Sequence, residues 1–508
     1  MKVSRILLIQ PHEFYNPEID YFRIGPSLAC AFLSSVLKRN GYEVEYIDAT
    51  AEAVENEIFV KNDLIRVGLD YDEIKKRIAR YNPQVVGVTN IRTPQFPAVR
   101  DICRLVKEVN PGIVTLIGGA HATGDYEKIL LDKNIDFIAR GEGELSIVKL
   151  MEYLEGKIDL CNVPGIATNI DGETLKNQIE RVPDLNALPD PDYTIFKKEL
   201  YPNRHFHTAV IRGKFITDYV FSRGCDWACT FCASYMMTGN KCRFFDLDRI
   251  QDQLENLKEL GYDEILLEDN DVFLKPELSV KVFEMLNKMG FYWSILNGLN
   301  LARLTDEMID IIIEYGCSRV YFPVESLNIE IVENYKTRWR DFHKELGNVP
   351  RLCRKFTEAG IETEGGFMIG FPEETEEDIR KTIEFAKYLK DECGLSMALF
   401  FLVTPYPGTP FYWECKKKGY LIDENKYELF TFERAAIRTK HLTGQELEKI
   451  RMEGMREVNG EILYGEIRIK HHRPNVRDYY LSHPEYKWSK YFTNKYREDA
   501  KCRSSQLP

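Results

Sequence analysis

Short apolar runs alternate with amphipathic stretches along the first 155 residues of the 508-residue chain. This alternation predicts parallel strands joined by helices, in an α/β fold whose sheet is doubly wound as in flavodoxin-like or Rossmann-like domains. In such sheets ligands bind beyond the carboxyl ends of the strands. We therefore expect the loops after the strands to form one binding edge. The apolar runs are 5–10, 44–48, 85–90, 113–119 and 136–140, and the loops are 10–26, 89–94, 118–124 and 141–144.

A second alternation, from about residue 215 to 405, contains six strand-like runs. Six βα units in succession predict a barrel or a partial barrel, here a (βα)6 partial TIM barrel, whose active edge carries the residues just after each strand. The strand-like runs are 218–224, 264–270, 292–298, 319–326, 363–370 and 398–404.

The two alternations divide the chain into four parts. We expect a first domain over residues 1–155 and the partial barrel over residues 208–410. Residues 156–207 are rich in turn formers, with Asp171-Gly172 between two short runs, and predict a linker with a small hairpin. Residues 411–508 predict a small, mostly helical C-terminal extension. We expect its Tyr- and Lys-rich tail to be a packed extension, and a lid or a substrate clamp are the alternatives.

Charge and hydropathy narrow the class of protein. The net charge is −12 and the sequence pI is about 5.5, so the uniform basic face of a nucleic-acid-binding protein is not expected. No run of 18 apolar residues predicts a membrane span, and the N-terminal residues show no signal-peptide pattern. We therefore expect a cytoplasmic protein whose 12 cysteines stay reduced. Clustered cysteines in such a protein are candidate metal ligands.

Three cysteines, Cys225, Cys229 and Cys232, lie after the first barrel strand with the spacing C-x3-C-x2-C. Three thiolates can hold three irons of a four-iron cluster and leave the fourth iron open for a chelating ligand. The pattern therefore predicts a catalytic iron–sulfur cluster. The alternative is a zinc site, although zinc knuckles usually use C-x2-C pairs. Its additional ligands would be Cys242, or His205 and His207.

The chain resembles the radical SAM superfamily at these cysteines, because that superfamily carries CxxxCxxC after the first strand of a (βα)6 partial barrel. The run GFMIGFPEET is similar to its G-x-I-x-G-x-x-E strand motif, with Met368 in place of isoleucine. The resemblance implies a [4Fe-4S] cluster on the three cysteines and S-adenosyl-L-methionine (SAM) on the open iron. It also implies that the glutamates of LLEDN and VES contact SAM, where a carboxylate can bind the methionyl ammonium. The implied SAM-binding residues are Glu268, Glu325, Gly366, Gly370 and Glu373.

The first domain resembles the cobalamin (B12)-binding domain of the B12-dependent radical SAM branch, class B methylase type. The resemblance lies in IGPSLACAFLSSVLKRNGYEVEYIDA, IGGAHAT and RGEGE, and it implies bound cobalamin. Many cobalamin domains carry D-x-H-x-x-G with a cobalt-binding histidine, but the run QPHEFY keeps only His12. The acid that would orient the imidazole is missing, so we expect cobalt to lack a protein nitrogen ligand. The candidate cobalamin-binding residues are His12, Thr89, Asn90, Arg92, Gly118, Gly119, Ala120, Gly141 and Gly143.

The two resemblances imply a C-methyltransferase. In that family a 5′-deoxyadenosyl radical abstracts hydrogen from an unactivated carbon, and methylcobalamin then supplies a methyl group. Two alternatives stay open at this point, a cyclisation or rearrangement that uses the same cofactors, and a redox sensor that only binds them. The expected partners are a small molecule, or a peptide or protein residue, as acceptor, and an external electron donor such as ferredoxin or flavodoxin.

Overall fold

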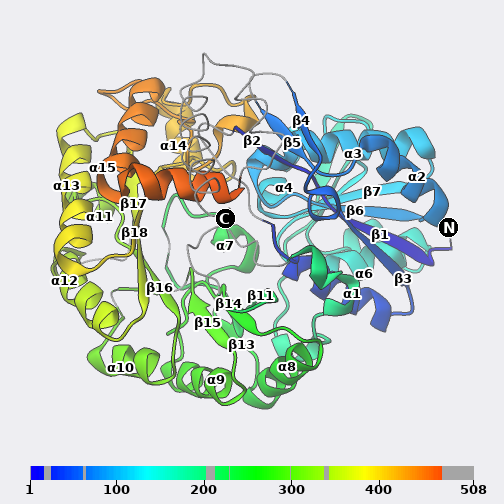
Figure 1. Ribbon diagram of the computed structural model, residues 1–508. Coiled ribbons are helices and arrows are strands. Elements are labelled where there is room, and N and C mark those ends of the chain that lie inside the picture. The colour runs from blue at the N-terminus through cyan, green and yellow to red at the C-terminus, as the bar shows by residue number, and fades with distance from the viewer. Residues whose placement is uncertain are drawn as a thin grey trace, which may run out of the picture.

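The computed structural model describes residues 2–16, 24–60, 64–201, 212–227, 229–297, 299–301, 303–336 and 342–471. Two α/β units lie side by side in it, and a helical C-terminal segment packs on the second unit (Figure 1). Among the described residues, no helix is long and apolar enough to cross a membrane.

The first unit is built on a seven-stranded sheet with the order β10-β9-β8-β7-β6-β1-β3. Its five strands from β3 to β8 are parallel, and their order is that of flavodoxin-like domains. The strands are β1 (Arg5–Gln10), β3 (Glu43–Asp48), β6 (Val85–Thr89), β7 (Val114–Gly118), β8 (Phe137–Ala139), β9 (Ile166–Ile170) and β10 (Glu173–Lys176). The five predicted strands and the doubly wound fold class are thereby confirmed.

Helices cover both faces of this sheet, which explains why its central strands are apolar without interruption. Leu8 belongs to the core cluster that contains residues of α1 and α6, whereas Leu7 and Ile9 belong to the one that contains residues of α2 and α3. The helices are α1 (Leu28–Arg39), α2 (Tyr71–Tyr81), α3 (Phe96–Val109), α4 (Ala120–Gly124), α5 (Tyr126–Ile129) and α6 (Gly143–Leu154), and a small antiparallel sheet contains β2 (Glu13–Tyr15), β5 (Ile65–Val67) and β4 (Glu57–Phe59).

The predicted hairpin is present as β9 and β10, joined at Asp171-Gly172. Asp171 has the positive φ of 52° and Gly172 one of 89°, the conformation that a two-residue hairpin turn requires. β9 pairs antiparallel with β8, so the hairpin extends the sheet of the first unit.

The second unit is a six-stranded parallel sheet with the order β11-β14-β15-β16-β17-β18. Because each strand pairs with the next one along the chain, the sheet curls in one direction as the predicted (βα)6 partial barrel (Figure 1). Its strands are β11 (Ile216–Tyr219), β14 (Glu264–Leu267), β15 (Tyr292–Ile295), β16 (Arg319–Pro323), β17 (Glu362–Ile369) and β18 (Met397–Leu402). The helices around it are α8 (Leu247–Glu259), α9 (Pro276–Lys288), α10 (Asp306–Glu314), α11 (Ile329–Tyr335), α12 (Phe342–Glu358) and α13 (Glu376–Cys393).

The C-terminal extension closes the edge of this sheet. It contains α14 (Pro410–Lys418) and α15 (Gly444–His471). The side chain of Asn459 on α15 donates through Nδ2 to the Ala398 carbonyl at 2.7 Å and accepts through Oδ1 from the Ala398 backbone amide at 2.9 Å. It thereby pairs with backbone groups of β18 that an edge strand leaves unpaired. The Tyr- and Lys-rich tail lies outside the described residues.

The two units are joined by ion pairs that are almost fully buried. A short ribbon of β12 (Ser222–Arg223) and β13 (Arg243–Phe244) carries two arginines toward the first unit. Arg243 donates to both carboxylate oxygens of Glu142, at 2.6 and 2.8 Å, and Arg223 donates to Glu144 at 2.7 Å. Charges taken out of water need such paired and hydrogen-bonded partners. These pairs hold the N-terminus of α6 against the barrel.

Replacing Arg243 by Met should destabilise the protein, because it removes the bidentate partner of the buried Glu142 carboxylate. We expect the free energy of unfolding to fall by about 3 kcal/mol. Urea denaturation measures the change. The control is Lys381→Met, which breaks an exposed pair with Glu377 and should leave the free energy of unfolding nearly unchanged. Equal shifts for the two variants would show that the buried pair contributes no more than a surface pair.

Candidate functional site

The cysteine loop starts at a position that only glycine can occupy. Gly224 has a φ of +102°, and a Cβ there would lie 2.5 Å from the carbonyl oxygen of Lys241. The next residue, Cys225, donates its amide to the carbonyl of Gly239 at 3.2 Å. The start of the loop at Cys225 therefore lies beside Gly239, the residue that follows α7 (Ser234–Thr238).

Other elements hold the rest of the loop. Cys229 forms an antiparallel β-bridge with Lys336, which follows α11. Thr230 donates its amide to the Tyr335 carbonyl at 2.8 Å and accepts from the Phe411 amide at 3.0 Å. The Ser234 amide donates to the sulfur of Cys232 at 3.5 Å. A loop of this length is thus fixed by contacts from both the barrel and α14.

The three cysteines of the loop are partly exposed free thiols, unlike most of the others that the structure describes. Burial raises the pKa of the Cys225 thiol to about 11 and that of Cys229 to about 12. Among the described residues, no three His, Cys, Asp or Glu side chains gather as they would around a single metal ion. A four-iron cluster does not need such convergence, because each thiolate binds a different iron. The donor set therefore fits the predicted cluster.

The zinc alternative involves residues around the same loop. Cys242 lies in the β12–β13 ribbon region and is a partly exposed free thiol. His205 and His207 lie outside the described residues.

Sequence reasoning did not identify Arg181, which supports this loop from the first unit's side. Its guanidinium donates to the carbonyls of Tyr235, Met236 and Met237 at 3.0 to 3.1 Å. These carbonyls lie at the end of α7, where a helix leaves acceptors without intrahelical partners. A single arginine in a proline-rich segment gives no sequence signal for this contact.

Glu325, just after the end of β16, meets Gly366 in the middle of β17. Glu325 has a φ of +65°, donates its amide to the Gly366 carbonyl at 3.0 Å and accepts from the Met368 amide at 3.1 Å. Its carboxylate pairs with Lys336 at 2.6 Å, and both side chains are about nine-tenths buried. A Cβ on Gly366 would lie 1.7 Å from the Tyr321 hydroxyl, so this position has room for glycine alone. Glu325 and Gly366 are thus brought together beside the cysteine loop.

The two glutamates after Gly370 have different environments. Glu374 is fully buried and accepts from the amides of Gly370 and Phe371 and from the Ser326 hydroxyl, at 2.6 to 3.0 Å. Burial raises its pKa to about 7. Glu373, the residue that the motif designates, instead accepts from the Tyr335 hydroxyl at 3.0 Å and lies 3.5 Å from Lys440. Glu374 shapes the end of β17, and sequence reasoning did not single it out.

The two acids after β14, Glu268 and Asp269, also have different environments. Glu268 lines a cavity and accepts a hydrogen bond from the Asn297 amide. Asp269 is fully buried and accepts from the Ser222 amide and hydroxyl and from the Phe221 amide. Burial raises the pKa of Asp269 to about 7. It fixes the chain immediately before the cysteine loop.

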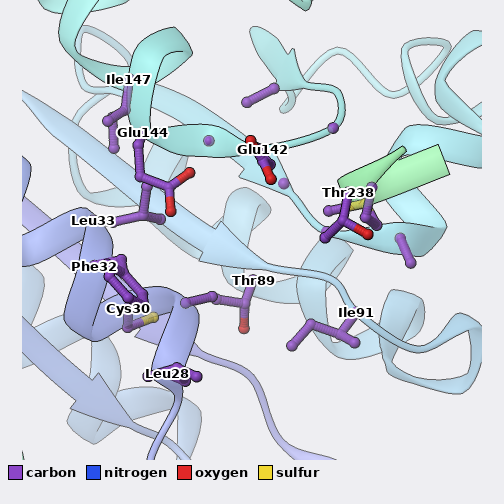
Figure 2. A pocket seen from close by; sticks show the side chains of 18 of the residues that line it. Leu28, Cys30, Phe32, Leu33, Thr89, Ile91, Glu142, Glu144, Ile147 and Thr238 are labelled. Carbon is purple, nitrogen blue, oxygen red and sulfur yellow. The ribbon is translucent and has the colours of Figure 1, made fainter. Parts of the chain in front are cut away.

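A cavity of about 350 Å³ opens between the units and extends over the sheet of the first unit (Figure 2). Seven of the predicted cofactor residues line it. They are Thr89, Gly118, Gly119, Ala120, Gly141, Gly143 and Glu268. Gly119 has a φ of +120°, and a Cβ there would lie 2.5 Å from the Asn90 carbonyl. The cavity therefore collects the strand-end loops of both sheets, as expected for a ligand site at the carboxyl edge.

Three other candidates lie away from the cavity lining. His12 is fully buried, contacts the Leu69 carbonyl through Nε2 at 2.6 Å and packs edge-on against Tyr71. Burial lowers its pKa to about 4. Asn90 donates its side-chain amide to the Arg92 carbonyl at 3.1 Å, and the Arg92 side chain pairs with Glu13 on β2.

Sequence reasoning missed the part of the cavity that lies over the first sheet. Its lining includes Leu8 and Gly87 on the strands and Cys30, Phe32 and Leu33 on α1 (Figure 2). The sequence does carry a signal for it, because a glycine in the middle of a buried strand often marks a close approach of a ligand. Gly87 stands at the centre of VVGVT.

Single Cys→Ala substitutions at 225, 229 and 232 should each abolish cluster formation, because the loop has no fourth cysteine that could replace the lost ligand. Cys242→Ala should leave it intact. The iron and zinc contents of each variant, measured after anaerobic reconstitution with iron and sulfide, check this. Bound zinc that is lost in Cys242→Ala would establish the zinc site instead.

Comparison with known protein families gives two matches. The radical SAM superfamily matches residues 219–386, and the B12 binding domain matches residues 21–151. The first match runs from the end of β11 into α13 of the barrel, and the second contains β3, β6, β7 and β8 of the first sheet.

Similar curated proteins match the chain across both parts. The cytidylyl-2-hydroxyethylphosphonate methyltransferase of Streptomyces wedmorensis is 27% identical over 90% of each chain. The anaerobic magnesium-protoporphyrin IX monomethyl ester cyclase of Rubrivivax gelatinosus is 26% identical over 84% of this chain and 73% of its own.

Solved structures show the same fold. The radical SAM methyltransferase TsrM from Kitasatospora setae, with cobalamin and a [4Fe-4S] cluster bound, matches with a TM-score of 0.63 and 17% identity over 82% of this chain and 75% of its own. The cobalamin-dependent radical enzyme OxsB matches with a TM-score of 0.66 and 16% identity over 88% of this chain and 66% of its own. This chain therefore contains a B12-binding domain followed by a radical SAM domain, and the radical SAM domain carries the cysteine loop.

Proposed function

We propose that this enzyme transfers a methyl group to an unactivated carbon of an acceptor held between its two domains. The cavity carries this proposal, because one continuous lining contains Thr89 and Gly119 of the B12-binding domain and Glu268 and Asn270 of the barrel. A reaction that uses both cofactors in turn needs their sites to be adjacent and fixed.

When bound, the cluster and SAM supply a hydrogen-abstracting radical, and cobalamin supplies the methyl group. The chain's own residues bind, orient and enclose these groups. Cys225, Cys229 and Cys232 would hold the cluster, and the Glu268 carboxylate would accept hydrogen bonds from the methionyl ammonium of SAM. Gly366 leaves room for the Tyr321 hydroxyl of β16, and β17 would lie beside the adenine of SAM.

The part of the cavity lining where the two domains meet contains charged side chains that are paired with one another. Glu142, Glu144 and Arg223 line the cavity, and each carboxylate is paired with an arginine of the β12–β13 ribbon. Paired charges of this kind stay in place without recruiting water, which supports a site that keeps a reactive radical away from solvent.

A cyclisation with the same cofactors is the second candidate, and the likeness to the magnesium-protoporphyrin ester cyclase favours it. The redox-sensor alternative has no counterpart among the relatives named above. The acceptor is a separate proposal. The names of relatives suggest a phosphonate nucleotide, a hopanoid or a tetrapyrrole, and a peptide residue completes the set to be tested.

Methyl transfer and cyclisation differ in how SAM is consumed. The reconstituted enzyme is incubated with reductant, SAM carrying a labelled methyl group and each acceptor. We expect equal amounts of 5′-deoxyadenosine, S-adenosylhomocysteine and labelled product, because each turnover uses one SAM for hydrogen abstraction and one to restore the methyl group. Formation of 5′-deoxyadenosine and an unlabelled product, without S-adenosylhomocysteine, would support the cyclase instead.

Glu268→Gln should weaken SAM binding by about tenfold, because a neutral amide replaces the carboxylate that we place at the SAM ammonium. The dissociation constant of SAM for the cluster-loaded protein measures this. Glu277→Gln, at an exposed position on α9, is the matched control and should bind SAM like the unchanged enzyme. If both variants bind SAM normally, Glu268 does not contact it.

The enzyme needs an external one-electron donor, and we propose a ferredoxin or a flavodoxin. We also propose a cytoplasmic location, which the free thiols of the described cysteines support.

A further inference from the structure

The first turn of α14 is hydrogen-bonded to the cysteine loop. The Phe411 amide donates at 3.0 Å to the carbonyl of Thr230, which lies between Cys229 and Cys232. The Phe411 ring also belongs to the apolar cluster on which Phe231 of the loop packs. A path from α14 to Cys229 therefore crosses one hydrogen bond and otherwise follows covalent bonds. Because electrons tunnel better along bonded paths than across gaps, α14 offers a short route to a cluster on this loop.

The opposite face of α14 is exposed. Phe411 and Cys415 are buried, whereas Pro410, Trp413 and Lys417 are exposed at the spacing of one helix face. Trp413 is 55% exposed, more than either of the other tryptophans that the structure describes. Tryptophan is enriched among the residues that contribute most to protein–protein binding. This face is therefore a candidate docking surface for a protein.

Three consecutive lysines end the helix and give this face its charge. Lys416 pairs with Glu424 and Lys418 with Glu414, both at 2.6 Å, and each lysine is more exposed than its partner, at 45% against 36% and 48% against 32%. Lys417 is exposed and forms no ion pair with the residues that the structure describes. Since the whole chain has a net charge of −12, an acidic partner is repelled by most of the surface and attracted here.

The cysteine loop also approaches the surface at Asp226, on the side away from α14. Asp226 and the buried Asp271 share the guanidinium of Arg303. Two carboxylates with one guanidinium leave an excess of negative charge, which opposes the approach of an acidic partner. The charges around the loop therefore favour the α14 side.

We propose that the outer face of α14, centred on Trp413 and Lys417, is the docking surface for a flavodoxin, an acidic flavoprotein that delivers one electron at a time. The lysines attract its acidic surface, and the Trp413 indole packs against the flat exposed edge of its flavin. One electron leaves the anionic flavin hydroquinone, which becomes the neutral semiquinone, and reduces the cluster, and no bond is made or broken. The proposal rests on the external electron donor proposed above and is independent of the acceptor.

Binding of flavodoxin to the cluster-loaded enzyme, measured by calorimetric titration, tests this surface. Lys417→Glu should weaken binding by about tenfold, because it places a negative charge against the acidic partner, and Trp413→Ala should weaken it by a similar factor. Raising the salt concentration from about 50 to about 500 mM should weaken binding to Trp413→Ala as strongly as to the unchanged enzyme, and binding to Lys417→Glu less.

The matched control is Lys281→Glu, the same charge reversal at an exposed position of α9, on the other side of the barrel (Figure 1). It should bind flavodoxin like the unchanged enzyme. Equal losses at Lys417 and Lys281, or no loss in either α14 variant, would overturn the proposal. Binding of a ferredoxin at α14 without binding of flavodoxin would overturn the assignment to a flavoprotein.

Cleavage of SAM separates docking from chemistry, because dithionite is a small reductant that needs no docking surface. The ratio of the flavodoxin-driven rate to the dithionite-driven rate should fall about tenfold in Lys417→Glu and stay unchanged in Lys281→Glu. An enzyme that binds flavodoxin through α14 but methylates no acceptor would refute the proposed reaction and leave the docking surface standing. Methyl transfer with an unchanged ratio in Lys417→Glu would refute the docking surface alone.

Discussion

The buried pairing of Glu142 with Arg243 is the contact on which the relation between the two domains depends. Both groups lose their water when the domains meet, and this loss is offset only because two short charge-assisted hydrogen bonds form in a fork geometry. The fork geometry of these two hydrogen bonds is lost when the carboxylate and the guanidinium shift relative to each other. It therefore fixes the orientation of the B12-binding sheet relative to the barrel, and with it the distance between the two sets of strand ends.

The same contact positions the cysteine loop. Arg243 and Arg223 lie on the two strands of one short ribbon, and Gly224 and Cys225 follow Arg223 directly. Arg181 reaches the far end of the loop from the segment that leaves the first sheet. The loop is thus held at both ends by groups that belong to or contact the first domain, so its geometry depends on the domain interface as much as on the barrel.

The sequence supported the strands of the two sheets and the cysteine loop well, because both have strong local signals. The period of apolar residues indicated eleven strands of the two sheets, and the spacing of Cys225, Cys229 and Cys232 indicated the loop. Only part of the cavity lining could be predicted from the sequence. Residues in turn-rich loops, such as Gly119, were found, whereas Leu33 and Ile147 looked like ordinary core residues of amphipathic helices. Nothing local distinguishes a side chain that packs on its neighbours from one that faces a hollow between them.

Two pairs of adjacent acids show why a motif cannot by itself assign roles. In Glu268-Asp269 and in Glu373-Glu374 the second residue is fully buried and accepts hydrogen bonds from two successive backbone amides and a serine hydroxyl. Its burial raises its pKa to about 7 in both cases, which shows how much desolvation opposes the charge that these hydrogen bonds favour. Glu268 and Asp269 directly follow β14, where adjacent side chains still point in opposite directions, whereas Glu373 and Glu374 are separated by the turn after β17. Glu268 then faces the cavity, whereas Glu373 faces Tyr335 and Lys440, and only the packing of the strand ends decides between these outcomes.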